Sequence, residues 1–255
     1  MQPGKLLNDL RSRQNHPARV LNASLRILKP VRARTSPVEE EGPPDTTIIR
    51  VATDSAADMI VMGARGLKGL KSFVLGSVTR SVAINSPVPV LVTKPFHGET
   101  PERMKLLFVT DGSPSAQSTA KLLAAMPFPS GTELTIMNVA WSAASEIPER
   151  YVMQIDNRIK EHAAKAKTIE LEASEKIIGA ARASLEGRFS GITGVSRSGD
   201  PSLEILAESE TRKPDLVAMG SRGMRGMKGM LGSVSRRVLG HCQCPVLIGK
   251  AAEHA

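Results

Sequence analysis

An internal repeat constrains the fold of this 255-residue chain more than any other feature. The first copy begins at Val38 and the second at Val195, and they align at an offset of 157 residues up to Lys71 and at 156 thereafter. The landmark matches are Gly42 with Gly199, Asp58 with Asp215, Gly63 with Gly220, Gly76 with Gly232, and Pro89 with Pro245. Self-similarity at a fixed offset predicts two copies of one structural unit.

Each copy contains the same succession of predicted elements. A helical stretch is followed by a short apolar strand, a glycine-rich loop, a second helix and a proline-bounded strand. The predicted ranges are 46–57, 59–62 and 88–93 in the first copy, and 202–211, 216–219 and 245–249 in the second. Short, wholly apolar strands that alternate with helices predict an open parallel sheet with helices on both faces.

The second copy extends further upstream than the first. Strands are predicted over 104–110, 133–139 and 191–197, with a helix after Ser113-Pro114 and a long helix over about 149–186. Residues 103–250 therefore predict one complete five-stranded α/β domain. Met1 aligns with about Arg158, so the first copy, residues 1–98, lacks strands 1 and 2. We expect it to be unstable alone, and either a partner or an upstream segment could complete it.

Composition excludes several classes of protein. Hydrophobic residues make up 41% and charged residues 23%, which predicts a packed core. No apolar run approaches the ~18 residues of a membrane helix, and the first twenty residues do not resemble a signal peptide, so we expect a cytoplasmic protein. The net charge of +9 invites a nucleic-acid partner, but the basic residues are scattered without interleaved aromatic residues. Nucleic-acid binding is therefore not favoured.

Two cysteines, Cys242 and Cys244, are separated by a single residue. A disulfide across that spacing would be strained, which argues against a structural bridge. With the adjacent His241 they do not match the usual zinc-ligand spacing. We predict small buried thiols that lead into a strand.

The strongest motif is a glycine loop that occurs in both copies between a strand and a helix. It reads Gly63-x-x-Gly66-x9-Gly76-Ser77 in the first copy and Gly220-x-x-Gly223-x8-Gly232-Ser233 in the second. Glycines let the backbone approach a ligand, and the amides at the helix start attract an anion, so the loop predicts a phosphate cradle. The alternative is a tight loop that only serves helix–sheet packing.

Asp111 follows the first predicted strand of the complete domain, where an open sheet binds its ligands. Its carboxylate could accept a hydrogen bond from a ribose hydroxyl or an adenine amine, or it could be a simple turn aspartate. Four basic residues of the loops could neutralise phosphates or form a solvated face: Arg65, Arg222, Arg225 and Lys228. No Ser/His/Asp or paired-carboxylate arrangement is evident, so no catalytic residues are predicted.

These glycine motifs, the turn Val109–Ser113 and the closing strands before Lys94 and Lys250 resemble the universal stress protein family. The resemblance covers about 20–94 and 105–250. It implies a five-stranded α/β fold with strand order 3-2-1-4-5. It also implies pairing through the last strand, here Val88–Thr93 with Pro245–Gly249, within the chain or in a homodimer. Members that keep the glycine motif generally bind ATP.

The resemblance assigns roles to individual residues. Asp111 and Val139 would hold adenine and ribose. The residues that would hold ribose and phosphates are Met219, Gly220, Gly223, Gly232, Ser233 and Val234. In the first copy the phosphate side is matched by Met62, Gly63, Gly66, Gly76, Ser77 and Val78, without an adenine side. The second loop is one residue shorter, which could shift the phosphate-binding amides or merely shorten the intervening loop.

The resemblance thus implies a stress-response protein that binds ATP, with or without Mg²⁺, and acts as a nucleotide sensor or regulator. A structural or interaction protein whose glycine loops serve packing is the first alternative, and a slow ATPase is the second.

Overall fold

The computed structural model describes residues 18–31, 33–65, 75–94, 103–141, 157–189, 191–224 and 230–251. The chain divides into two units, Met1–Thr47 and Ile48–Ala255. In the first unit, residues 18–28 are helical and η1 (Lys29–Val31) continues them as a 3-10 turn. Residues 33–41 have no regular structure and are exposed throughout.

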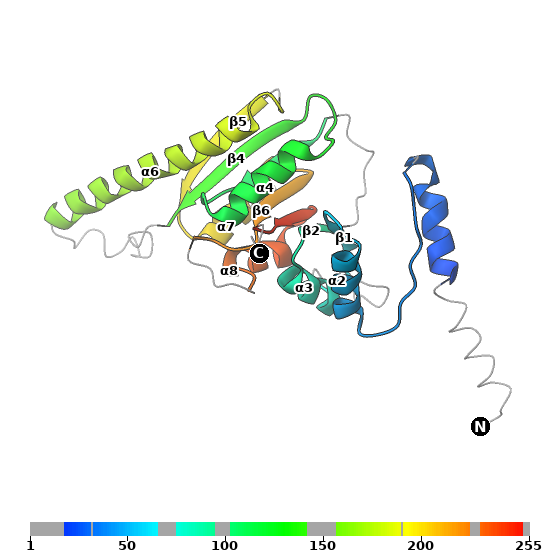
Figure 1. The fold of residues 1–255 in the computed structure, drawn as a ribbon. Coiled ribbons are helices and arrows are strands. Elements are labelled where there is room, and N and C mark those ends of the chain that lie inside the picture. Colours follow the sequence, from blue (N-terminus) through cyan, green and yellow to red (C-terminus); the bar gives the residue numbers. More distant parts are fainter. Residues whose placement is uncertain are drawn as a thin grey trace. The chain divides into compact units, whose positions relative to one another are not determined.

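A seven-stranded sheet organises the second unit (Figure 1). Its strands are β1 (Ile60–Gly63), β2 (Val90–Thr93), β3 (Lys105–Val109), β4 (Glu133–Ala140), β5 (Gly191–Ser198), β6 (Leu216–Gly220) and β7 (Val246–Gly249). They lie in the order β1-β2-β7-β6-β3-β4-β5. The strands of the second half alone follow the predicted order 3-2-1-4-5, which confirms the fold. The sheet has seven strands rather than five because β1 and β2 of the first half extend it.

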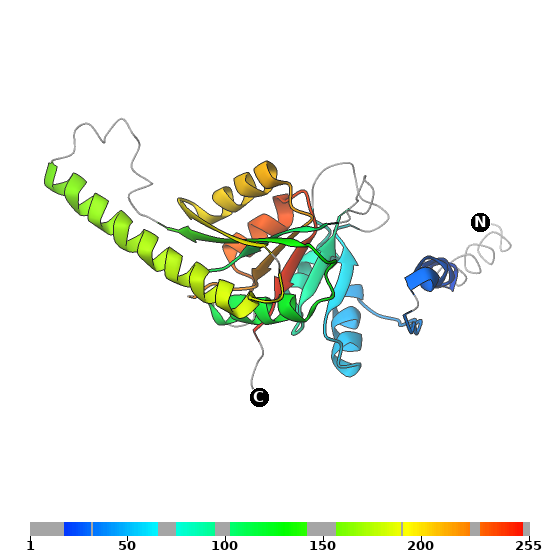
Figure 2. The same ribbon diagram turned by 90° about the horizontal axis from the view of Figure 1, so that it is seen from above.

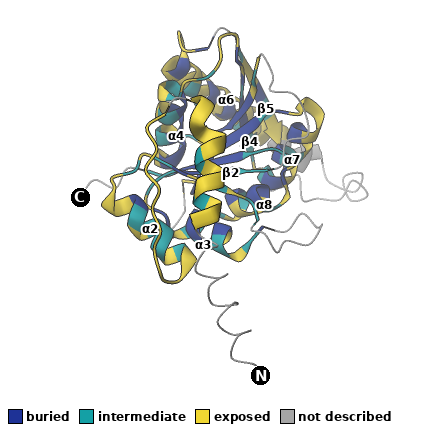
Figure 3. Ribbon diagram, turned by 90° about the vertical axis from the view of Figure 1, so that its right-hand side faces the viewer, coloured by how far each residue is buried: buried dark blue, intermediate teal, exposed yellow. Residues whose placement is uncertain are grey.

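Helices cover both faces of this sheet. They are α2 (Pro44–Asp54), α3 (Ser77–Asn85), α4 (Pro114–Ala125), α6 (Asn157–Leu185), α7 (Pro201–Arg212) and α8 (Ser233–His241). Figure 2 shows α7 and α8 on one side of the sheet and α4 and α6 on the other. Two apolar cores result: α2, α3, α7 and α8 contribute to the first, and α4 and α6 to the second. Figure 3 shows the contrast between buried β4 and the exposed outer surface of α2.

The two halves meet along β2 and β7, the one antiparallel pair of strands that the structure describes. Leu91 lies opposite Leu247, its own counterpart in the repeat, so the pairing has the self-complementary form of a two-fold interface. Lys94 Nζ donates to the carbonyls of Leu239 and Cys242 at the end of α8. Lys250 Nζ donates in the same way to the end of α3. The predicted pairing of the last strands is therefore present within one chain.

The first half lacks a counterpart of β5. By the repeat offset, residues 34–41 align with β5 (Gly191–Ser198), yet they form no strand. In the second half, β5 pairs with β4 along its whole length. The described first-half residues contain no counterpart of β4, so the segment 34–41 has no neighbour to satisfy a row of backbone hydrogen bonds. Among the described residues, the segment 34–41 therefore has no strand beside it with which to form a counterpart of β5.

Candidate functional site

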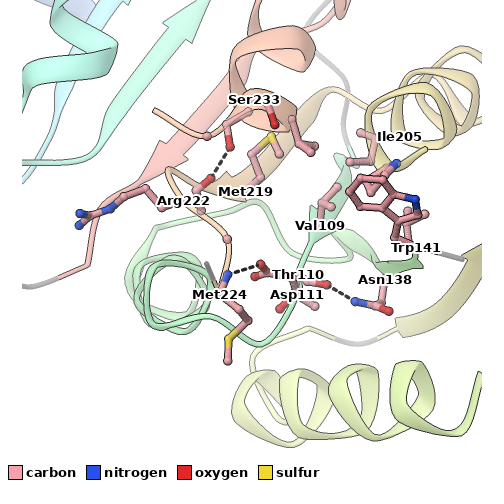
Figure 4. Close-up of a pocket in the computed structure, with 17 residues that line it drawn as sticks. Val109, Thr110, Asp111, Asn138, Trp141, Ile205, Met219, Arg222, Met224 and Ser233 are labelled. Atoms are coloured by element: carbon pink, nitrogen blue, oxygen red, sulfur yellow. Dashed lines mark hydrogen bonds between the residues drawn. The ribbon is translucent and has the colours of Figure 1, made fainter. Parts of the chain in front are cut away.

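A cavity of about 800 Å³ opens at the carboxyl ends of β3, β4 and β6 (Figure 4). It lies beside the start of α8, at the topological switch point of the sheet. Here β4 and β5 lie on one side of β3, and β6 and β7 lie on the other. The structure brings together around it all eight second-half residues that the sequence proposes. These are Asp111, Val139, Met219, Gly220, Gly223, Gly232, Ser233 and Val234.

Asp111 ties the glycine loop to the end of β3. Its Oδ1 accepts a hydrogen bond from Ser113 N at 3.1 Å, and its Oδ2 accepts one from Met224 N at 3.1 Å. A methyl group on Gly223 would lie 2.8 Å from the same Oδ2, so glycine permits this close approach. The turn role that was one of the two interpretations of Asp111 is therefore present. An ionised carboxylate has about four acceptor sites, so capacity for a ligand remains.

The turn after Asp111 forms because its sequence caps a helix. Ser113 is the N-cap of α4 and accepts a hydrogen bond from Ala116 N, with Pro114 in the first turn, as predicted. Ser113 Oγ and Ser115 Oγ also donate to the carbonyl of Arg222, at 3.0 and 2.5 Å. The start of α4 thus fixes the first part of the glycine loop.

Gly220 has a packing role in this arrangement. A Cβ atom at this position would overlap Ser115 Oγ and lie 2.8 Å from the backbone nitrogen of Ala116. Gly232 differs, because its φ is −57° and a methyl group added there would make only ordinary contacts, at 3.4 Å or more. The glycines of one motif therefore have different surroundings: Gly220 admits α4, Gly223 admits Asp111, and Gly232 lines the cavity at the start of α8.

The start of α8 supplies unpaired amides. Gly232 is the N-cap and makes no side-chain capping bond, and Ser233, Val234 and Ser235 all line the cavity. The first amides of a helix have no partner within the helix, and the helix dipole makes them attractive to an anion. This end of the cavity is suited to phosphate oxygens.

The shorter second loop closes in the same way as the first. Gly232 N donates to Ser221 O at 2.8 Å, and Gly76 N donates to Ala64 O at 2.9 Å. The hydroxyl of Ser235 donates to Gly220 O at 2.8 Å, and that of Thr79 donates to Gly63 O at 2.9 Å. The hydrogen bonds at the base of the loop are therefore equivalent in the two copies, which favours the alternative that the one-residue difference only shortens the intervening loop.

The opposite wall is apolar. Val109, Val139, Ile205 and Met219 line it, and Asn138 Nδ2 donates to Thr110 O at 2.7 Å behind it. Trp141 lies at the cavity with 68% of its surface exposed. The sequence prediction missed Trp141 and Ile205. A usable signal existed for Trp141, the sole tryptophan, which stands two residues after Val139.

The first half carries only the phosphate side of such a site. Gly63 ends β1, Gly76 is the N-cap of α3 and Ser77 begins that helix, while Met62 and Val78 pack on the core. Gly66 lies outside the described residues. Among the strands that the structure describes, β1 pairs with β2 alone, so no carboxylate equivalent to Asp111 stands beside the loop.

Of the basic loop residues, Arg222 lines the cavity, but its charged group does not point into it. Figure 4 shows the Arg222 side chain directed away from it. Arg225 and Lys228 lie outside the described residues, and Arg65 lies in the first half. In the parts of the chain that are described, no group of three or more His, Cys, Asp or Glu side chains could hold a metal ion. Over the same parts, none of the helices is both long and apolar enough to cross a membrane.

An open sheet with a loop and helix start at its switch point defines a doubly wound α/β protein. The chain belongs to the universal stress protein family, whose family model matches residues 6–94 and 102–250. A universal stress protein of Methanocaldococcus jannaschii is 45% identical over 53 residues, which cover 21% of this chain and 33% of the relative. The chain thus spans about a third of the length of that curated relative.

A solved structure of the family shows the same fold. A universal stress protein from Archaeoglobus fulgidus has a TM-score of 0.62 and 25% identity, covering 96% of this chain and 79% of that chain. A universal stress family protein from Arabidopsis thaliana was solved with AMP bound. It is 18% identical with a TM-score of 0.39, covering 58% of this chain and 91% of that chain.

Proposed function

We propose that the second half of this protein, residues 103–250, binds ATP in the cavity beside α8. The proposal rests on one observation: an apolar wall, a carboxylate and the amides of a helix start converge on a single cavity of about 800 Å³. We further propose that the protein acts in the cytoplasm as a stress-response nucleotide sensor or regulator, through its conformation or its partners. Residues 1–98 form an incomplete copy of the same domain.

The cavity offers complementary surfaces for the parts of ATP. Val139 and its apolar neighbours provide a surface for adenine, and Asp111 can accept hydrogen bonds from ribose hydroxyls. The amides of Ser233 and Val234 face the phosphates at the positive end of α8. Mg²⁺ would enter with the phosphates, because the described residues offer no cluster of ligands for it.

The repeat provides a matched test. A methyl group on Gly232 or on Gly76 would meet equivalent neighbours at 3.4, 3.6 and 3.7 Å, so both positions tolerate a side chain to the same degree. Gly232→Val places a branched side chain at the cavity, whereas Gly76→Val does so in the half without an adenine wall. Titration calorimetry with Mg·ATP should detect one site, weakened at least tenfold by Gly232→Val and unchanged by Gly76→Val. Lack of binding to the wild-type chain at millimolar ATP would refute the proposal.

A structural or interaction protein remains the second candidate because one observation favours it: Gly220 is required for packing against α4. If that candidate is right, Gly232→Val and Gly76→Val should change stability equally and ATP should bind to neither half. Circular dichroism melting curves of the two variants, recorded with and without ATP, distinguish the candidates.

A further inference from the structure

The chain's only two cysteines are in contact with each other. Cys242 caps the end of α8 and Cys244 lies two residues later, ahead of β7, and their sulfur atoms are 3.3 Å apart. Both thiols are free; Cys242 is 3% exposed and Cys244 is half-buried. The first half has Ser86 and Val88 at these positions, so the fold itself does not require a pair of thiols.

A lysine from the other half faces this pair. Lys94 Nζ donates to the carbonyl of Cys242 and, at 3.5 Å, to that of Leu239. Burial lowers the pKa of Lys94, and the charge of Cys242 opposes that effect. The corresponding Lys250 donates to the carbonyls of Ala83 and Ile84, where no thiol stands nearby, and burial and the charge of Arg222 lower its pKa to about 8. Of the two equivalent lysines, Lys94 therefore has a thiol beside it that can serve as its counter-ion when ionised.

The two sulfur atoms share one proton unequally. The hydrogen bond with the Cys244 thiol lowers the pKa of Cys242 to about 6. Burial opposes this shift, and the Cys244 amide and the charge of Lys94 add to it. The same hydrogen bond, together with burial, raises the pKa of Cys244. The opposite directions of the two pKa shifts favour the thiolate on Cys242 and the thiol on Cys244, 3.3 Å apart, which is the pairing of a nucleophile with a resolving thiol.

We propose that Cys242 and Cys244 form an oxidative modification site at which a small hydroperoxide generates a reversible disulfide within the chain. The Cys242 thiolate attacks the distal peroxide oxygen, the O–O bond breaks, and the leaving alkoxide or hydroxide takes up a proton. The sulfur of Cys244 then attacks the Cys242 sulfenic acid, and its proton leaves with the displaced hydroxide as water. Two thiols lose two electrons, which the peroxide gains.

The surroundings set the specificity and the consequence of this reaction. Burial of Cys242 restricts the oxidant to small hydroperoxides such as hydrogen peroxide. A bridge across one intervening residue is strained, so thiol reductants should reverse it readily. Oxidation removes the negative charge that faces Lys94, where the two halves pair through β2 and β7. The oxidised chain should therefore melt at a lower temperature than the reduced chain.

Peroxide treatment of the full chain, followed by alkylation and mass spectrometry, tests the site. The wild type should lose two hydrogen atoms, block both cysteines together and recover both thiols with dithiothreitol. Cys244→Val, which copies Val88, should stop at a sulfenic acid that dimedone traps. Cys242→Ser, which copies Ser86, should leave Cys244 unoxidised under the same conditions.

The paired lysines supply the control. Lys94→Met should raise the pH at which the Cys242 thiolate forms and slow the oxidation below that pH, whereas Lys250→Met should leave both unchanged. Three results would overturn the proposal: thiols that stay free in folded protein at millimolar peroxide, disulfides that form only between chains, or native mass spectra with a metal ion held by the two sulfurs. Equal rates in the two lysine variants would also overturn the role of Lys94.

Discussion

The substitution Gly220→Ala tests whether the two copies of the glycine loop have diverged in their packing. Its new methyl group would overlap Ser115 Oγ and approach the backbone nitrogen of Ala116 to 2.8 Å, at the start of α4. Backbone cannot move aside as cheaply as a flexible side chain, so we expect a cost near the upper part of the overpacking range, about 2–3 kcal/mol. For a unit of this size that corresponds to a fall in Tm of about 4–12 °C.

The matched variant is Gly63→Ala. The same repeat position in the first half has no counterpart of α4 against it, and the nearest atom to the new methyl group is Arg65 O at 3.4 Å. We expect this variant to unfold within about 0.5 kcal/mol of the wild type. Urea denaturation followed by circular dichroism measures both. Equal losses in the two variants, or a neutral Gly220→Ala, would refute the assignment of Gly220 to α4 packing.

Two further predictions concern the stability of the sheet and its cover. Burial raises the pKa of Glu208, but the hydrogen bond from Arg212 and the charges of Arg197 and Arg212 outweigh it and hold the pKa below its usual value. The ionised carboxylate therefore stabilises the fold above pH ~4.3, and this stabilisation is lost as the pH falls through the lower pKa of the folded state. Glu208→Gln should cost about 1–2 kcal/mol of unfolding free energy at pH 7 and flatten the acid dependence of Tm. An unchanged dependence of Tm on pH would contradict this prediction. Leu247→Ala should lower the free energy of unfolding by about 2–5 kcal/mol, because Leu247 is fully buried under α4. Leu91→Ala, at the half-buried counterpart position, should lower it less. The reverse order would contradict the difference in helix cover between the two copies.

The repeat predicted the succession of elements well because its strands β1, β2, β6 and β7 are short apolar runs near glycine or proline. Six observed strands start and end within two residues of their predicted bounds, and β7 begins one residue after Pro245. The predicted five-stranded order is present, and the predicted pairing of the last strands joins β1 and β2 to it in one seven-stranded sheet. The antiparallel register that sets Leu91 against Leu247 was not predicted, because no local pattern encodes it.

The predictions that were wrong or incomplete concern features that depend on residues distant in the sequence. Residues 34–41 align with β5 yet form no strand, because strand formation depends on a neighbour and not on the segment alone. The long helix was predicted from about residue 149, and the described helix α6 begins at Asn157, with 142–156 outside the described residues. Ile205 reaches the cavity from α7, a helix whose predicted role was only to cover the sheet.

The glycine motif shows what spacing cannot convey. The sequence treated Gly220, Gly223 and Gly232 as one phosphate-binding set, whereas their surroundings differ: helix backbone, a carboxylate and an open cavity. It also weighed Asp111 as either a turn residue or a ligand-binding residue. The two hydrogen bonds to Ser113 N and Met224 N establish the first role, and the second stays a prediction.

The most direct measurement of the central claim uses the single tryptophan, since Trp141 lines the cavity beside the proposed adenine surface. We predict that titration with ATP changes Trp141 fluorescence saturably, with one site per chain. Gly232→Val should weaken this response, whereas Gly76→Val should leave it unchanged. Emission that stays constant up to millimolar ATP in the folded wild-type chain would contradict a nucleotide site at this position.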